Sequence, residues 1–428
     1  MIGLKRGTVQ LCEHENQWEI EAKNTICRLK KILGNVANDI QHVGSTAIPS
    51  IKAKPIIDIA VAVDDFNDVL ALEKELTDKG FYYRPQVDLG EQLLFASGSL
   101  YDGTGDLQTH FIHVVRSGSM DWINYINFRD YLNQNPAVAK EYESLKVSLA
   151  LQAPIDSGRE KYLKGKHDFI VYTLRKALVK SYLGRTVDIK IDRPIGYVHK
   201  KENYSLTYPI NYGYLPGVIG GDGEELDVYL LGVNEPVTAY TAKIIGIAHR
   251  ENDVEDKLVA APADMIFYQN EIAEAIHFQE QYYTTTVESI YEKSAGAVLC
   301  TVSDDKIKYL LIKSQNGDIG FPKGHIEQGE NEESAALREI YEETSIKAEL
   351  TGDFKAKIEY TMPNGKNKTV IYFTAVYANQ TPKHNDGFEH NEYMLLEYNK
   401  ALESLSFENT KELLAKANEF INKKGNLK

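Results

Sequence analysis

The stretch GHIEQGENEESAALREIYEETSI runs from Gly324 to Ile346 and places three glutamates close together. Residues three or four positions apart share one face of an α-helix, so Glu339, Glu342 and Glu343 are expected to project together. Like charges at this spacing repel, and only Arg338 offers a positive charge nearby. A hard divalent cation such as Mg²⁺ would supply the missing charge, because it favours carboxylate oxygens together with substrate phosphates. Since glutamate-rich helices are more often merely solvated, the cluster alone leaves both interpretations open.

The spacing of the whole stretch favours the metal site. Gly324, Glu330, the run Arg338–Glu343 and Ile346 fall at the spacing of the Nudix hydrolase signature, and Ser345 stands where that signature has glycine. The stretch therefore resembles the Nudix hydrolases, which implies an α/β/α sandwich that hydrolyses a nucleoside diphosphate linked to another group. Glycine at that position lies just past the helix end, where a positive φ is common, so we expect Ser345 to cost about 1 kcal/mol of stability.

The resemblance also implies roles for the signature residues. The glutamates matching Glu339, Glu342 and Glu343 would hold Mg²⁺, with Mn²⁺ as an alternative, and the carbonyl group of Gly324 could join them. Arg338 would orient the carboxylates. The metal would polarise phosphoryl oxygens and lower the pKa of the attacking water. One of these glutamates, or an acid outside the signature, would serve as the base, and the sequence leaves this choice open.

Other segments of the same block narrow the substrate class. The segments GFPKGHIEQGE, YTMPNGKNKTVIYFTA, FEHNEYMLLEY and SFENTKELLAKANEFI together resemble the asymmetric diadenosine tetraphosphate hydrolases. By this resemblance Glu389 would add a catalytic acid near the metal, and Tyr372 would lie in the substrate cleft. The residues expected to bind substrate are Lys323, His325, Lys368 and Tyr372. In the alternative interpretation Lys368 is a solubilising charge and Tyr372 is a core residue.

A middle block carries a second candidate phosphate site. The run YPINYGYLPGVIGGDGEELDVYLLG, followed by RENDVEDKLVAAP, resembles the Mg²⁺-dependent soluble inorganic pyrophosphatases. Carboxylates on neighbouring loops could bind metal ions for phosphoanhydride cleavage. The alternative is a trimmed structural or ligand-binding relative, since the amino-terminal strands of the full enzyme are shortened to VDIKIDRPIGYVHKK. The residues that match the metal and phosphate ligands are Asp222, Glu224, Asp227 and Tyr212 and, more loosely, the acidic run of Asp253, Glu255 and Asp256 with Lys257.

The first block carries a third candidate site. The run HVGSTAIPSIKAKPIIDIAVAV, together with THFIHVVRSGSMDWINYINFRDYLNQNPAVAKEYESLK, resembles the GrpB family, whose members look like nucleotidyltransferases. In that superfamily a Gly-Ser turn holds a nucleotide phosphate and strand aspartates bind Mg²⁺. Gly44, Ser45 and Asp58 reproduce the opening of the pattern. The second acidic position on the same strand face is Ala60, so transferase activity would need a carboxylate from elsewhere.

Length and composition predict several globular domains. The chain has 428 residues, 43% of them hydrophobic, and a net charge of −14 that disfavours nucleic acid and anionic lipid as partners. The three cysteines are far apart and suggest neither a disulfide framework nor a clustered zinc site. Apolar runs such as IIDIAVAV are much shorter than the roughly 20 residues that span a bilayer. We therefore expect an unprocessed, soluble, cytoplasmic protein without a membrane segment, and its oligomeric state stays open.

The predicted architecture is a multidomain α/β and α+β protein. We expect a nucleotidyltransferase-like α/β domain over 1–180, a small β-rich pyrophosphatase-like domain over 184–286 and a Nudix sandwich over 288–428. The leading hypothesis is a Mg²⁺-dependent hydrolase of nucleoside polyphosphates, and in particular of dinucleoside tetraphosphates. Alternatives are nucleotidyl transfer by the first domain with the third as nucleotide sensor, pyrophosphate hydrolysis by the middle domain, and a binding protein with three degenerate sites.

Overall fold

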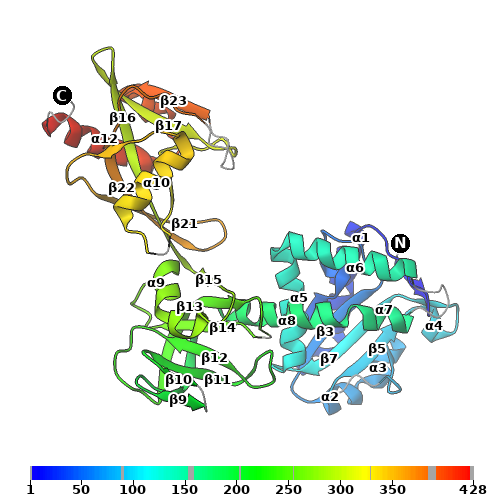
Figure 1. The fold of residues 1–428 in the computed structure, drawn as a ribbon. Coiled ribbons are helices and arrows are strands. Elements are labelled where there is room, and N and C mark those ends of the chain that lie inside the picture. The colour runs from blue at the N-terminus through cyan, green and yellow to red at the C-terminus, as the bar shows by residue number, and fades with distance from the viewer. Residues whose placement is uncertain are drawn as a thin grey trace. The chain divides into compact units, whose positions relative to one another are not determined.

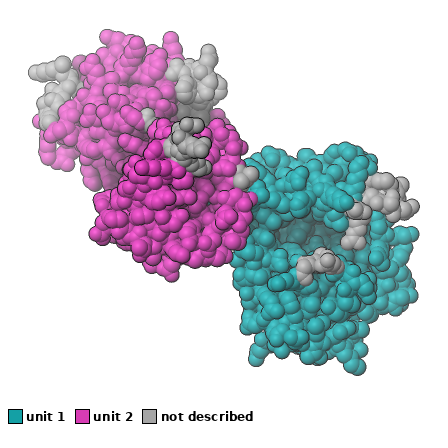
Figure 2. Space-filling view, turned by 60° about the horizontal axis from the view of Figure 1, so that its bottom comes forward, with its two compact units in different colours: residues 1–182 teal, residues 183–428 magenta. Residues whose placement is uncertain are grey.

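The computed structural model describes residues 2–87, 91–152, 159–201, 204–253, 255–327, 329–383 and 392–424. The chain divides into two compact units, unit 1 over residues 1–182 and unit 2 over residues 183–428 (Figure 2). In the described part of the chain, no helix combines the length and the apolar character needed to cross a membrane.

Unit 1 is built on a five-stranded sheet with the strand order β2-β3-β7-β5-β4. Strands β3 and β7 are parallel, and the other neighbours are antiparallel. Strands β1 and β6 form a separate pair. The strands of unit 1 are β1 (Leu4–Lys5), β2 (Ala37–Val43), β3 (Ile57–Val63), β4 (Tyr82–Tyr83), β5 (Leu93–Ser97), β6 (Leu107–Gln108) and β7 (His110–Arg116).

Helices pack around this sheet (Figure 1). Alternation along β3 directs Ile59 and Val61 into a core with Trp18 and Leu29 of α1, and it directs Asp58 to the opposite face, which α5 contacts. The helices are α1 (Asn16–Leu33), η1 (Gly34–Val36), η2 (Ser45–Ala47), α2 (Phe66–Ala71), α3 (Glu73–Asp78), α4 (Ser99–Asp102), α5 (Met120–Gln134), α6 (Pro136–Gln152), α7 (Arg159–Gly165) and α8 (His167–Tyr182).

The first part of unit 2 is a small barrel. Its sheet has the order β14-β12-β11-β8-β13-β15, and it closes because β14 pairs with both β12 and β13. Helix α9 packs Ile272 and Ile276 into the barrel core. The elements are β8 (Thr186–Arg193), β9 (Val198–Lys201), β10 (Tyr204–Thr207), β11 (Asn211–Ile219), β12 (Glu225–Leu230), β13 (Ala239–Arg250), β14 (Lys257–Ala261), α9 (Gln269–Glu280) and β15 (Thr285–Ser289).

The second part of unit 2 is an eight-stranded mixed sheet with helices on both faces. Alternation along β16 places Leu299 against Ile340 of α10 and places Val298 against Leu414 of α12. The elements are β16 (Tyr291–Ser303), β17 (Lys306–Lys313), β18 (Ile319–Gly320), β19 (Lys323–His325), α10 (Glu332–Thr344), β20 (Glu349–Leu350), β21 (Ala356–Thr361), β22 (Asn367–Val376), β23 (Glu392–Glu397), α11 (Tyr398–Ser404) and α12 (Glu408–Lys424).

These elements confirm the expected fold class, an α/β unit followed by a β-rich barrel and an α/β/α sandwich. The expected domain division at 286–288 falls inside β15, because Glu288 and Ser289 still pair with β13 of the barrel. The other domain limits stay a prediction.

Candidate functional site

Helix α10 presents its glutamates opposite a buried apolar face. Asn331 caps the amino terminus by accepting a hydrogen bond from the Ser334 amide at 2.8 Å. Ala336 and Ile340 are buried against the sheet, so the helix cannot rotate without exposing them. At the other end Ser345 has φ 60, which confirms the expected left-handed conformation at the position where the signature has glycine.

Arg338 organises the acidic face of α10. Its Nη1 group donates to Glu339 Oε1 and to Glu342 Oε2, both at 2.8 Å. Its Nε and Nη2 groups donate to the two carboxylate oxygens of Glu330, both at 2.9 Å, and Nη2 also donates to the carbonyl oxygen of His325 at 2.7 Å. The planar guanidinium group thus links the helix to the preceding loop through hydrogen bonds. The hydrogen bonds from Arg338 are the largest cause of the lowered pKa of Glu330.

Gly324 brings the backbone of β19 against Glu339. A Cβ atom at this position would overlap with the Glu339 carboxylate, so only glycine allows the carboxylate to lie there. Burial raises the pKa of Glu339, and the neighbouring charge of Glu342 adds to this effect. The third glutamate, Glu343, accepts a hydrogen bond from the Lys323 amide at 2.9 Å.

The donor set fits a divalent cation. Helix α10 supplies three carboxylates, of which Glu339 lies against the backbone of Gly324, and a buried carboxylate with a raised pKa gains from a nearby positive charge. In the described ranges no three acidic, histidine or cysteine side chains already converge as ligands. The reason is that Arg338 holds Glu339 and Glu342 while the amide of Lys323 holds Glu343.

A cluster of cations around Glu292 lies beside the glutamate loop. Lys368 is buried, and its Nζ atom lies 3.2 Å from Glu292 Oε2 and 2.9 Å from His325 Nε2. Lys366 reaches Glu292 Oε1 at 3.2 Å and Glu288 Oε1 at 3.5 Å. Burial by itself would raise the pKa of Glu292, but hydrogen bonds from His325 and Lys368 outweigh it and lower this pKa to about 2.

Sequence reasoning missed Glu292 and Lys366. Glu292 lies in β16, and Lys366 directly precedes β22. The pairing of these strands is known only from the fold: β16 runs parallel to β22, and Glu292 stands opposite Lys368. The sequence offered one signal for them, the lysines at and around position 366, because a lysine that becomes buried needs a carboxylate partner. The structure therefore makes Lys368 a partly desolvated, paired cation rather than a solubilising charge.

The expectations for Tyr372 and Glu389 have different outcomes. Tyr372 is 3% exposed and packs with Phe321 and Val370 in a hydrophobic core, so the expectation that it lines a cleft is wrong. The reason is strand alternation, which turns Tyr372 and Val370 to the same inner face. The predicted acid Glu389 lies outside the described residues.

The barrel places a lysine where a metal ion was expected. The Lys257 ammonium group is hydrogen bonded to the carboxylates of both Asp227 and Glu255. The residues therefore do not fit a metal in this arrangement, because the positive charge between the two acids is already supplied by the chain. Burial raises the pKa of Glu255 to about 7 despite Lys257. Tyr212 is buried, and burial also raises its pKa.

The expectation for Asp256 is wrong. Its carboxylate lies 2.7 Å from His249 Nδ1 and accepts from the Arg250 amide at 3.1 Å, whereas Glu255 faces Asp227. Glu255 and Lys257 thus lie on the side of Asp227, whereas the residue between them, Asp256, contacts His249 and the Arg250 amide. Of the remaining loop acids, Asp222 and Glu224 are exposed, and Asp222 accepts from the Glu224 amide at 2.9 Å.

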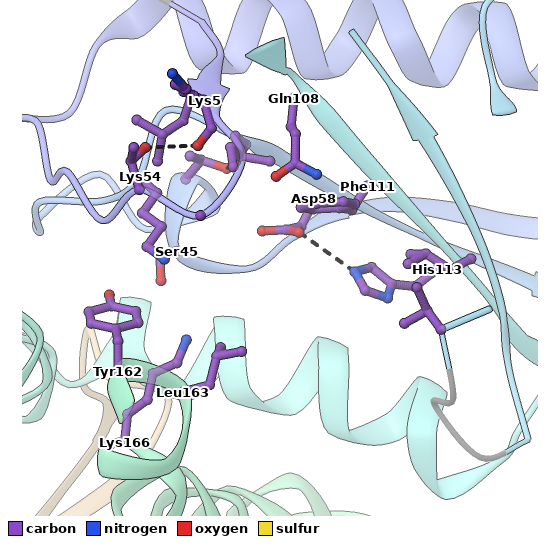
Figure 3. A pocket seen from close by; sticks show the side chains of 17 residues that line it. Lys5, Ser45, Lys54, Asp58, Gln108, Phe111, His113, Tyr162, Leu163 and Lys166 are labelled. Atoms are coloured by element: carbon purple, nitrogen blue, oxygen red, sulfur yellow. Dashed lines mark hydrogen bonds and ion pairs between the residues drawn. The ribbon is translucent and has the colours of Figure 1, made fainter. Parts of the chain in front are cut away.

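Unit 1 brings its predicted residues together. Gly44 has φ 70, and a Cβ atom there would overlap with the Asp58 carboxylate, so the glycine turn and the aspartate are in direct contact. Ser45 and Asp58 line a common cavity with His113, whose Nε2 atom lies 3.6 Å from Asp58 Oδ1 (Figure 3). Ala60, which is fully buried, occupies the second position on this face of β3.

Comparison with known proteins accounts for all three parts of the chain. Family models match in succession, described as GrpB protein over residues 8–176, inorganic pyrophosphatase over 184–293 and NUDIX domain over 293–417. The glutamate-rich protein GrpB of Alkalihalophilus pseudofirmus is 40% identical over 40% of this chain and 96% of the relative. The asymmetrical bis(5'-nucleosyl)-tetraphosphatase of Rattus norvegicus is 32% identical over 28% of this chain and 84% of the relative.

The chain belongs to the GrpB and Nudix families. A solved GrpB structure from Enterococcus faecalis is 30% identical to the GrpB domain, and the match covers 40% of this chain and 99% of that one with a TM-score of 0.37. The Nudix domain makes the protein a hydrolase that acts on phosphoric anhydride bonds of nucleoside polyphosphates. The middle barrel is similar to inorganic pyrophosphatases.

Proposed function

We propose that the Nudix domain hydrolyses dinucleoside polyphosphates, with diadenosine tetraphosphate as the representative substrate, in a Mg²⁺-dependent reaction that releases two mononucleotides. The observation that carries this proposal is the arrangement around Arg338, which holds two of the three glutamates in place next to Gly324. The similarity to the rat tetraphosphatase supports the substrate class.

The metal ion, the glutamates and Arg338 have different roles in the proposed reaction. Bound Mg²⁺, or Mn²⁺ in its place, would supply Lewis acidity toward the phosphoryl oxygens. Glu339, Glu342, Glu343 and the backbone at Gly324 are the groups that would hold it. Arg338 orients Glu339 and Glu342, and this fixed orientation lowers the reorganisation that the reaction requires. A glutamate outside the metal shell, or Glu389, would accept the proton of the attacking water.

The cation cluster is suited to the polyphosphate chain. Lys368 and His325 lie 2.9 Å apart beside the glutamate loop, and Lys323 belongs to the same strand as Gly324. The lysine ammonium groups are point charges that bind phosphate oxygens without selecting a base. We therefore assign substrate binding to Lys323, His325 and Lys368, with Lys366 as a further member, and we assign Tyr372 to the core.

The test is product chromatography with diadenosine tetraphosphate, nucleoside diphosphate sugars, nucleoside triphosphates and inorganic pyrophosphate, with Mg²⁺ and with EDTA. Glu342→Gln should lower turnover at least a hundredfold, about 2.7 kcal/mol of barrier, and leave the circular dichroism spectrum unchanged. Glu333→Gln, an exposed glutamate of the same helix, is the matched control and should keep wild-type activity. Activity that survives in Glu342→Gln, or that is lost only in Asp227→Asn or Asp58→Asn, would contradict the proposal.

A further inference from the structure

A chain of charged side chains connects the barrel to the Nudix domain within unit 2. It begins on β13 at His249, whose Nε2 atom lies 3.4 Å from Glu288 Oε2. The other carboxylate oxygen of Glu288 lies 3.5 Å from Lys366 Nζ, and the same ammonium group lies 3.2 Å from Glu292 Oε1. Lys366 is therefore held between one carboxylate of the barrel and one carboxylate of the Nudix sheet.

Backbone hydrogen bonds fix the junction that carries these two carboxylates. Ile290 is the single residue between β15 and β16, and its amide donates to the Ile245 carbonyl of β13 at 2.9 Å. Its carbonyl accepts from the Asn367 amide of β22 at 2.8 Å. The hydroxyl group of Tyr268, just before α9, donates to Thr369 Oγ1 of β22 at 3.2 Å. The junction is therefore bonded to the barrel and to the Nudix sheet, and the two carboxylates lie two residues to either side of it.

Partial burial makes these pairs stronger than ordinary surface pairs. The side chains of Glu288 and Glu292 are 16% and 13% exposed, and that of Lys366 is 23% exposed. Salt screens partly buried pairs much less than exposed ones. A lysine side chain is a flexible four-carbon stem, so contacts with two fixed acids restrict where its ammonium group lies.

His249 is held from its other side as well. Its Nδ1 atom lies 2.7 Å from Asp256 Oδ2, and the second carboxylate oxygen of Asp256 accepts from the Arg250 amide at 3.1 Å. The contact at Nδ1 sets the orientation of the ring and hence the direction in which Nε2 meets Glu288. The backbone of the barrel thus supports Glu288 through His249.

We propose that Glu288 and His249 are positioning residues of the Nudix reaction: Glu288 holds Lys366 for contact with the polyphosphate, and His249 holds Glu288. This inference rests on the proposed function, in which Lys366 and Lys368 bind the phosphate chain. A cation that is fixed before binding loses less freedom when the phosphate arrives. The barrel thereby contributes to substrate affinity and takes no part in the chemical step.

The first experiment compares two amides at position 249 in the full-length protein. The nitrogen of asparagine is bonded to Cγ, as Nδ1 of histidine is, so His249→Asn keeps a donor toward Asp256. The nitrogen of glutamine lies one bond further, as Nε2 does, so His249→Gln keeps a donor toward Glu288. We expect His249→Asn to raise the KM for diadenosine tetraphosphate about threefold at unchanged kcat, and His249→Gln to restore the wild-type KM. His277→Asn, at an exposed histidine of α9 in the same barrel, is the control and should leave KM unchanged.

The second experiment is a double-mutant cycle between Glu288 and Lys366. Glu288→Ala should raise KM about fivefold and Lys366→Ala about tenfold, both at unchanged kcat. The double variant should have the KM of Lys366→Ala alone, because Glu288 acts through that lysine. Circular dichroism checks that each variant is folded, and this cycle decides the question if a variant at position 249 is unfolded.

Three results would overturn the inference. The first is an unchanged or lower KM in Glu288→Ala, since a carboxylate that only weakens the positive potential at the lysines gives a lower KM when it is removed. The second is additive effects in the double variant. The third is an equal KM in His249→Asn and His249→Gln. The kinetics use whichever nucleotide the wild type hydrolyses, so a substrate other than diadenosine tetraphosphate contradicts the proposed function and leaves this test intact.

Discussion

Arg338 shows how a single side chain can define a site. It donates five hydrogen bonds, which join Glu330, Glu339, Glu342 and the carbonyl of His325. Charge-assisted bonds from a planar guanidinium group restrict direction as well as distance. The acidic face of α10 is therefore ordered by the chain itself.

Gly324→Ala tests whether the position of Glu339 matters for turnover. The new Cβ atom would overlap with the Glu339 carboxylate, and the flexible side chain would be displaced. We expect kcat/KM to fall at least tenfold, about 1.4 kcal/mol of transition-state stabilisation, with little change in Tm. Gly320→Ala is the matched control, because a Cβ atom there has no neighbour within 4 Å. Equal activity of the two variants would show that the contact is irrelevant to catalysis.

The lowered pKa of Glu292 predicts a pH-dependent contribution to stability. A carboxyl group whose pKa falls from 4.5 to about 2 on folding stabilises the protein above pH 4.5, and this contribution is lost as the pH falls toward 2. Glu292→Gln should lower the free energy of unfolding by about 1 kcal/mol at pH 7, after allowance for solvent screening, and by less at pH 3. Urea unfolding followed by circular dichroism measures the difference.

The control for Glu292 is Glu397→Gln. Glu397 forms an exposed pair with Lys306 at 2.9 Å, and exposed pairs contribute little. An identical destabilisation of Glu292→Gln at pH 3 and pH 7 would contradict the prediction.

At the scale of the element, the end of α10 is strained. Ser345 has φ 60, a conformation that costs a non-glycine residue about 1 kcal/mol. Its hydroxyl group donates to the Lys383 carbonyl at 3.1 Å, which returns part of this cost. Serine at the position of the family's glycine therefore lowers the stability slightly.

Ser345→Gly should therefore stabilise the Nudix domain by about 0.5 kcal/mol and leave kcat/KM unchanged. Thermal inactivation of hydrolysis measures the stability of this domain. Ser345→Val is the opposing variant and should be destabilised, because a β-branched residue tolerates this φ least. Greater stability of the valine variant would be inconsistent with the strain argument.

The adjacent acids Glu255 and Asp256, just before β14, have different partners. Glu255 and Lys257 lie on the side of Asp227, while Asp256 contacts His249. The barrel consequently satisfies its acids with an internal lysine. This is the element-scale reason why Asp227 and Glu255, among the described residues of the barrel, do not fit a metal ion in this arrangement.

At the scale of the whole molecule, the two units have separate hydrophobic cores. The core around Trp18 contains residues of unit 1, and the cores on the two faces of β16 contain residues of unit 2. Units with separate cores can unfold separately. The two tryptophans of the chain, Trp18 and Trp122, report on unit 1, and Nudix turnover reports on unit 2.

Leu29→Ala should separate the two transitions. Leu29 is 1% exposed in the core of unit 1, and its truncation should cost about 3 kcal/mol. We expect the urea midpoint of tryptophan emission to fall while the urea dependence of Nudix turnover stays at the wild-type value. A parallel shift of both midpoints would mean that the units unfold as one.

The part of the site that the sequence predicts is local. The helical period alone places Glu339, Glu342 and Glu343 on one face of α10, and the left-handed position of Ser345 follows from the end of the same helix. Partners that are distant in sequence could not be found in this way. Lys257 meets Asp227 through the pairing of β12 with β14, and Glu292 meets Lys368 through the pairing of β16 with β22.

The sequence by itself determined the acidic helix, because periodicity and motif spacing are properties of neighbouring residues. Its resemblances to three known families indicated the fold class and the order of the domains. The tertiary structure decided which side chains share a charge. In the folded chain Tyr372 is a core residue, and Asp256 contacts His249. Lys54 and Lys166 both lie near the ring of Tyr162. The physical reason is that strand pairing and burial assign a partner to each buried charge, and these contacts exist only once the chain has folded.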